Sequence, residues 1–191
     1  MNSLLKKLSP TVTNMIRMDH THVMVTFHQY EADTAPQTKR ALVNTACVAL
    51  EIHAQLEEEI FYPAVRRVAT DRKVMDQVVP QHDEMRRLIA KLRDMEPTDA
   101  EFDNTFMELM RDVMHHVADE ETVLLPAAEK LLGDEVSELG AKMTKRRLEL
   151  AVPRAGEIAG NTLRAMPAST MLMGVGAVLA SGLVLSALRR R

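Results

Sequence analysis

Apolar residues recur at helical spacing through the first 132 residues, and no glycine interrupts this pattern before Gly133. A stretch of this length without glycine has few tight turns, which is typical of long helices joined by short connections. Asn14 is the predicted N-cap of the first helix, and Gly133 is the predicted stop signal of the last. We expect four helices, over residues 14–30, 37–68, 76–95, and from just after 97–99 to 132.

Composition supports an all-α fold. The chain has four Phe, two Tyr and no Trp, so aliphatic residues and methionines must fill the core. Such a core suits packed helices better than strands rich in aromatic residues. We therefore predict a four-helix bundle over residues 1–133, followed by a C-terminal apolar helix. The single Cys47 cannot form an intramolecular disulfide, and we interpret it as a small buried residue in a reducing compartment.

The C-terminal part differs in character from this body. Residues 134–165 are predicted to form a basic amphipathic linker. Residues 166–188 carry no charge and are long enough to span a bilayer, so 166–191 is a predicted membrane anchor, with a buried helix as the alternative. The N-terminus does not resemble a secretory signal. We expect a cytoplasmic protein tethered to the cytoplasmic face of the membrane.

The distribution of charge narrows the choice of partners. Residues 1–133 contain 15 Lys and Arg against 22 Asp and Glu, a net charge of −7, whereas residues 134–191 contain 9 against 5, a net charge of +4. An acidic body argues against nucleic acid as the main partner, and a basic tail around an apolar stretch fits a membrane surface. The chain also lacks a glycine-rich nucleotide motif and any arrangement for nucleophilic catalysis.

An internal repeat is the most informative feature of the chain. The segment that starts at His53 reads HAQLEEEIFYPA, and the segment that starts 63 residues later, at His116, reads HVADEETVLLPA. The His, the two carboxylates that follow, the Pro and the Ala coincide. One His-xxx-Glu spacing arises by chance in many helices, whereas two copies in register indicate a common design.

A second pair of histidines shares almost the same offset. His20 follows Asp19 and His82 follows Gln81, and each histidine is followed at +3 and +7 by apolar residues. This spacing places both histidines on the core-facing stripe of a helix. The body therefore reads as two helical hairpins of similar design.

The constellation favours a metal site in the bundle core. Residues four apart lie one above the other on a helix, so His53 with Glu57, and His116 with Glu120, can reach one point. Four imidazoles and two carboxylates at one level are the donor set with which helical bundles hold two metal ions. A single histidine on an apolar stripe would be read as an ordinary helix residue, but buried charges in this number need a cation.

These motifs resemble the hemerythrin family in its bacterial His-His-Glu cation-binding form, over about residues 12–132. The resemblance implies an up-down-up-down four-helix bundle that holds two iron ions with oxo and carboxylate bridges. It implies that one iron is bound by His20 and His53, that the other is bound by His82 and His116, and that Glu57 and Glu120 bridge them.

One position departs from the family pattern. Arg86 stands where oxygen-carrying members have a fifth histidine, so one iron should lack a ligand or borrow one. Glu58, Glu121 and Tyr62 are the candidates for this role. Arg86 itself could stabilise a bound anionic peroxide if it points inward, and a surface salt bridge is the alternative.

Two adjacent histidines leave the assignment open. His22 lies two residues after His20 and so points to nearly the opposite helix face, which makes it the less favoured ligand. His115 stands beside His116, and the repeat favours His116.

The resemblance implies a non-haem di-iron protein that binds and reacts with O2, H2O2 or NO, as a peroxidase or catalase-like protein or a consumer of nitric oxide. Whether the chain is an enzyme stays open. The alternatives are an oxygen- or iron-sensing module without turnover, and a structural membrane adaptor. The predicted partners are a small oxidant or gas and a membrane contacted through residues 166–188, with a homo-oligomer left open.

Overall fold

The computed structural model describes residues 8–69 and 75–165, and helices are the only regular elements among them. The α-helices are α2 (Val12–His28), α3 (Pro36–Leu56), α4 (Tyr62–Val68), α5 (Met75–Asp94), α6 (Phe102–Asp119), α7 (Leu125–Leu132), α8 (Glu135–Ala151) and α9 (Ala155–Ala165). Two π-helical turns, Glu57–Phe61 and Glu120–Leu124, join α3 to α4 and α6 to α7, and a 3₁₀ turn, Val152–Arg154, joins α8 to α9.

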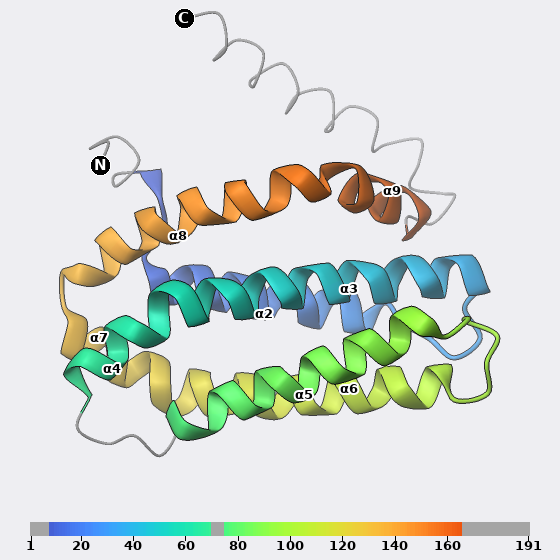
Figure 1. Ribbon diagram of the computed structural model, residues 1–191, viewed down its shortest axis with the longest axis horizontal. Coiled ribbons are helices and arrows are strands. Elements are labelled where there is room, and N and C mark those ends of the chain that lie inside the picture. The colour runs from blue at the N-terminus through green and yellow to red at the C-terminus, as the bar shows by residue number, and fades with distance from the viewer. Residues whose placement is uncertain (1–7, 70–74, 166–191) are drawn as a thin grey trace, which may run out of the picture.

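Four long antiparallel runs make up the body: α2, α3 with α4, α5, and α6 with α7 (Figure 1). The all-α prediction is confirmed, and the ends of the runs lie within two residues of those predicted. Gly133 ends α7 with a φ of 51°, a backbone conformation that favours glycine, as predicted for a stop signal.

Helix α2 begins two residues earlier than expected because Thr11 caps it. The side-chain oxygen of Thr11 accepts a hydrogen bond from the backbone N–H of Asn14 at 3.3 Å. Asn14 is therefore the residue whose free N–H is satisfied, and its prediction as the N-cap is wrong. Both residue types suit the N-cap position, so the sequence pattern alone could not separate them.

Each copy of the repeat widens into a π-helical turn at its glutamate. The backbone N–H of Tyr62 bonds to the carbonyl of Glu57, and the N–H of Leu125 bonds to the carbonyl of Glu120, five residues back in both cases. A proline follows at once in each copy, and its ring would clash with the carbonyl four residues earlier in a regular α-helix. The wider turn relieves that clash, so the shared proline explains why both glutamates stand at a π-bulge.

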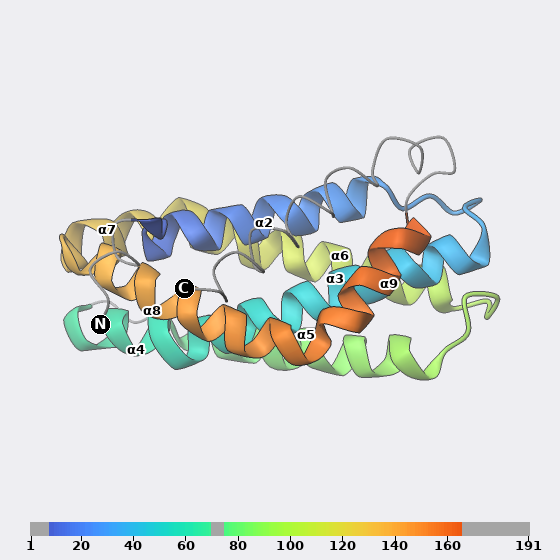
Figure 2. The same ribbon diagram turned by 90° about the horizontal axis from the view of Figure 1, so that it is seen from above.

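Residues 134–165 contain helices that pack along the bundle rather than a free connector. Helix α8 lies against α2, and α9 lies against α3, and together they run along the outside of the four-helix body (Figure 2). Gly140 permits the close approach of α8, because a Cβ at this position would come within 2.0 Å of the backbone oxygen of Pro10. The α8–α9 segment, residues 135–165, is thus part of the packed domain.

The predicted C-terminal apolar helix and membrane anchor, residues 166–191, lie outside the described residues. Across residues 8–69 and 75–165, no helix combines the length and the apolar character that a membrane crossing needs.

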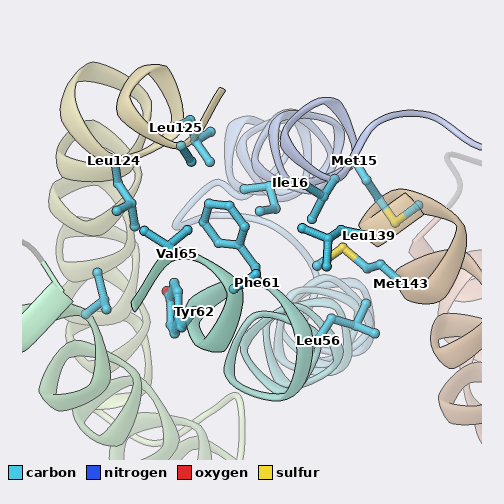
Figure 3. Packing of buried hydrophobic residues seen from close by; sticks show 14 of the residues in the cluster. Met15, Ile16, Leu56, Phe61, Tyr62, Val65, Leu124, Leu125, Leu139 and Met143 are labelled. Carbon is cyan, nitrogen blue, oxygen red and sulfur yellow. The ribbon is translucent and has the colours of Figure 1, made fainter. Parts of the chain in front are cut away.

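Two apolar clusters fill the interior, one toward each end of the bundle. The first joins α2, α4, α7 and α8 around Phe61, Tyr62 and Leu125 (Figure 3). The second joins α2, α3, α5 and α6 around Phe106, and it contains Cys47, whose thiol pKa burial raises to about 12. Cys47 is buried, as predicted. The histidine of the motif stands between residues of the two clusters on α2, on α5 and along the run of α6 with α7, so the polar site is a layer between two apolar blocks.

Candidate metal centre

Four histidines, one from each run of the bundle, meet in the layer between the apolar clusters. They come from α2, α3, α5 and α6, and none has more than 4% of its surface exposed. Two glutamates, each the first residue of a π-helical turn, join them and are fully buried. The six residues are His20, His53, His82, His116, Glu57 and Glu120, which are the six that the sequence pattern selected.

The Nε2 atoms of the histidines face the two carboxylates. Glu57 Oε2 lies 3.2 Å from His53 Nε2 and 3.3 Å from His82 Nε2. Glu120 Oε2 lies 3.2 Å from His20 Nε2 and 3.6 Å from His116 Nε2. Each glutamate therefore stands between one histidine of its own hairpin and one histidine of the other hairpin.

Three of the four histidines donate a hydrogen bond from Nδ1 on the outer side of the ring. Glu121 accepts from His20 at 2.8 Å, and Glu58 accepts from His82 at 2.9 Å. The side-chain oxygen of Gln81 accepts from His116 at 2.9 Å. These partners place the ring proton on Nδ1 and leave the Nε2 lone pair facing the centre, which is the tautomer of a metal-binding histidine.

The fourth histidine, His53, has a looser partner. The carboxylate of Asp19 lies 3.6 Å from His53 Nδ1, which is an ion-pair distance and too long for a hydrogen bond. Both oxygens of Asp19 instead accept from the guanidinium of Arg147 on α8. Interactions with His53 and Arg147 outweigh burial and hold the Asp19 pKa at about 2.

The outer partners follow the internal repeat, although the sequence analysis did not assign them this role. Asp19 and Gln81 each precede a motif histidine and face the histidine of a neighbouring helix. Glu58 and Glu121 each follow a buried glutamate and do the same. The signal for Asp19 and Gln81 was their matching place before His20 and His82, whereas nothing local marked Arg147.

Tyr62 is the one candidate for the missing ligand that reaches the centre. Its hydroxyl oxygen lies 2.8 Å from Glu120 Oε1, 2.9 Å from Glu57 Oε2 and 3.3 Å from His82 Nε2. Burial, followed by the charges of the two glutamates, raises the pKa of this phenol. Glu58 and Glu121 are oriented to the outer nitrogens and are partly exposed.

Arg86 does not point inward. Its guanidinium donates to both oxygens of Glu58 at 2.7 Å and to Asp83 at 3.0 Å, and 41% of its side chain is exposed. The suggestion that Arg86 stabilises a bound peroxide is therefore wrong, because Glu58 holds the guanidinium on the outside of His82. His22 and His115 are exposed and stand apart from the cluster.

The buried cluster lacks partners that a closed polar network would have. His20 Nε2, Glu57 Oε1 and Glu120 Oε2 make no hydrogen bond, although these atoms are fully enclosed. Burial, and then the charge of Glu120, raise the pKa of Glu57 well above its usual range. Burial also lowers the pKa of His82 and brings that of His116 to about 3, so both rings are neutral donors. Enclosed nitrogen and oxygen atoms that converge with so few hydrogen bonds among them fit a bound cation.

Two overlapping sets of donor atoms satisfy the spacing of a metal site. The ligand atoms of His20, His53, His116 and Glu120 lie within 4.8 Å of one another, and so do those of His53, Glu57, His82 and His116. A buried layer of imidazoles and carboxylates between four helices defines a bundle protein that holds metal at its centre.

The comparisons with known proteins specify this class. Residues 11–128 match the model of the hemerythrin HHE cation-binding domain, and the chain belongs to this family. Family and buried cluster together indicate metal binding, with iron as the indicated metal.

Two individual proteins are similar to this chain. A crystal structure of a hemerythrin HHE cation-binding domain-containing protein from Mycobacterium kansasii shares the fold, with a TM-score of 0.66 and 17% identity over 82% of this chain and 99% of that one. A DNA nickase from Nostoc sp. is 30% identical over 132 residues, which are 69% of this chain. The chain spans only 37% of the length of that relative.

Proposed function

We propose that this chain is a non-haem di-iron protein that binds and reacts with a small oxidant, O2, H2O2 or NO. The observation that carries the proposal is the set of enclosed nitrogen and oxygen donors that converge without partners of their own. Mixed imidazole and carboxylate donors suit iron. Bound ferrous iron supplies the electrons by which such an oxidant is reduced.

The contacts of the two glutamates support two metal ions rather than one. Glu57 touches His53 and His82, and Glu120 touches His20 and His116. If one ion is held by the histidines of α2 and α3, and the other by those of α5 and α6, each carboxylate faces one histidine of each pair. That is the position from which a carboxylate bridges two cations.

Tyr62 is our proposed replacement for the fifth histidine. Its oxygen lies beside His82, on the side of the site where the family pattern would place that ligand. When the site is metal-free, the hydroxyl proton can serve only one of the two glutamates at a time. A visible absorption band that is present in the iron-loaded protein and absent in Tyr62→Phe would support phenolate ligation.

A surface hollow gives a small molecule a route toward the site. It has a volume of about 510 Å³ and lies between α2 and α6, where His20 and Glu121 meet Met24 and Val117. Its mostly apolar lining suits small uncharged molecules such as O2, NO and H2O2. Glu121 lines the hollow and is bonded to His20, so the hollow reaches the outer partner of a proposed ligand.

The first experiment measures the metal content and visible spectrum of the full chain purified in air, beside a His20→Ala/His116→Ala variant. The matched control is His22→Ala/His115→Ala, which removes two exposed histidines from nearly the same places. We expect about two irons per chain in the wild type and the control, and loss of iron in the first variant. Zinc alone, or iron that survives in that variant, would contradict the proposal.

The second experiment separates turnover from sensing. The iron-loaded protein is mixed anaerobically with H2O2 or with NO in the presence of excess ascorbate as the electron donor, and consumption is followed over many equivalents per site. Sustained consumption supports a peroxidase or catalase-like protein or a consumer of nitric oxide. Binding that stops at one equivalent supports the sensing alternative. DNA cleavage, the activity in the name of the longer Nostoc relative, is not favoured because residues 1–133 carry a net charge of −7.

Tethering to the cytoplasmic face of a membrane through residues 166–188 is a separate proposal, supported by the uncharged run and its basic flanks. Fractionation of cells that express the full chain or residues 1–165 tests it. Recovery of both forms in the soluble fraction would contradict it.

A further inference from the structure

A second cavity lies outside the metal centre, between the four-helix body and the α8–α9 segment. It has a volume of about 230 Å³, and its walls come from α2, α3, α8 and α9. Val48, Ile52 and Ile158 supply apolar surface, whereas Arg147 and Asn161 supply polar groups. Helices α8 and α9 lie wholly beyond the matched family segment 11–128, so the matched segment alone does not form this cavity.

Two hydrogen-bond donors in the cavity wall have no partner. Asn161 is the buried residue of α9, with 4% of its surface exposed, and its side-chain nitrogen makes no hydrogen bond. Arg147 bonds to Asp19 through its terminal nitrogens, but its Nε is enclosed and also lacks a partner. A buried donor without a partner destabilises the fold, so an acceptor in the cavity would recover stability.

The charges around the cavity indicate an uncharged occupant. The one guanidinium in the wall is neutralised by the bidentate carboxylate of Asp19. A bound anion would compete with Asp19 for the guanidinium of Arg147, and a bound cation would be repelled by that guanidinium. The hydroxyls of Thr45 and Thr162 donate to backbone carbonyls within their own helices, which leaves them as acceptors only.

The size and lining of the cavity indicate the bulk and the polarity of its ligand. A dry cavity of about 150 Å³ accepts benzene, and drug-sized pockets begin near 300 Å³. A volume of about 230 Å³ therefore suits one substituted ring or a molecule of similar bulk. Apolar side chains on α3 and α9 would enclose its body, while Asn161 and Arg147 would donate to an oxygen.

We propose that this cavity binds a small uncharged molecule with a mostly apolar body and a carbonyl group, such as a ketone or quinone. The site does not depend on iron, because none of its wall residues belongs to the proposed ligand set. It lies next to Asp19, which faces His53, so an occupant would contact a residue that neighbours the metal centre.

The experiment titrates the full chain with acetophenone and with ethylbenzene, which has similar bulk but no acceptor, and follows the methyl signals of Val48, Ile52 and Ile158 by NMR. We expect both probes to shift these signals and acetophenone to bind about tenfold more tightly, as one net hydrogen bond provides. Asn161→Leu should remove the preference, whereas Asn104→Leu, a change at an exposed asparagine of α6, should preserve it.

A second variant covers the case in which Asn161→Leu fails to fold. Ala49→Leu adds bulk to the cavity wall and should abolish binding of both probes while the unshifted parts of the spectrum stay intact. The comparison of the two probes on the wild type is decisive by itself. Equal affinity for both probes, no shift at millimolar concentrations, or binding that persists in Ala49→Leu would overturn the proposal.

Discussion

Arg147→Met tests whether the α8–α9 segment supports the centre of the bundle. The guanidinium of Arg147 holds both oxygens of Asp19, and Asp19 in turn faces the outer nitrogen of His53. Methionine keeps most of the aliphatic length of arginine and removes the charge. The variant should therefore lose the ion pair while α8 retains much of its packing against α2.

The magnitude follows from the burial of the pair. Asp19 is 14% exposed and Arg147 is 32% exposed, so the pair lies between the surface limit of about 0–1 kcal/mol and the buried limit of about 3–5 kcal/mol. Lowering the Asp19 pKa from 3.8 to about 2 corresponds to roughly 2.5 kcal/mol, which is shared with His53. We expect Arg147→Met to reduce the free energy of unfolding by about 2 kcal/mol.

The assay is urea unfolding of the metal-free protein at neutral pH, as a double-mutant cycle with Asp19→Asn. We expect a coupling energy of about 1–2 kcal/mol between Arg147 and Asp19. The control is Arg146→Met, which breaks a more exposed pair with Glu59 and should cost less than about 1 kcal/mol. A coupling energy below about 0.5 kcal/mol, or an equal loss of unfolding free energy in the two arginine variants, would refute the inference that α8 supports Asp19.

Three further predictions concern other parts of the molecule. Gly140→Ala should destabilise the fold by more than about 2 kcal/mol in thermal unfolding because its Cβ would meet backbone, whereas Gly156→Ala, with nothing within 4 Å, should be neutral or slightly stabilising. Asp103→Asn should cost about 2 kcal/mol at neutral pH because it leaves the buried Lys39 ammonium without its carboxylate. Burial would raise the Asp103 pKa, but hydrogen bonds from Lys39 and the Tyr30 hydroxyl outweigh it and lower the pKa. This stabilisation is therefore present above the ordinary carboxyl pKa and is lost as pH falls through the lowered pKa. At that low pH the unfolding midpoints of the wild type and Asp103→Asn should converge. Glu121→Gln should weaken iron binding by about tenfold in competition with a chelator, and unchanged affinity would argue against a role in orienting its histidine.

The elements of the bundle and the six central residues could be predicted because they are encoded locally. A histidine and a glutamate four residues apart share a helix face, and the apolar residues at +3 and +7 show which face is buried. The choice of His20 over His22 followed from this periodicity. The repeat supplied the rest, since one helical copy constrains the reading of the other.

Features that depend on distant contacts could not be predicted in the same way. Arg86 has no local signal for its orientation, and only the fold shows that Glu58 holds it outside the bundle. Asp19 meets Arg147 across 128 residues of sequence. The charged, small-residue composition of 134–165 suits a connector as well as a pair of packed helices. The need for glycine at position 140 follows only from the close approach of Pro10.

The outer partners make the two halves of the centre chemically unequal, although the repeat makes its inner donors alike. Gln81, a neutral amide, accepts a hydrogen bond from His116 and donates one, at 3.1 Å, to Asp119, which lies on α6 with His116. The equivalent residue, Asp19, is a carboxylate that faces His53 and accepts hydrogen bonds from Arg147 of α8. A carboxylate partner raises the basicity of a metal-bound imidazole more than an amide does. In the half of the centre that contains His53, the donor strength of the imidazole therefore depends on Arg147 of α8, which holds Asp19.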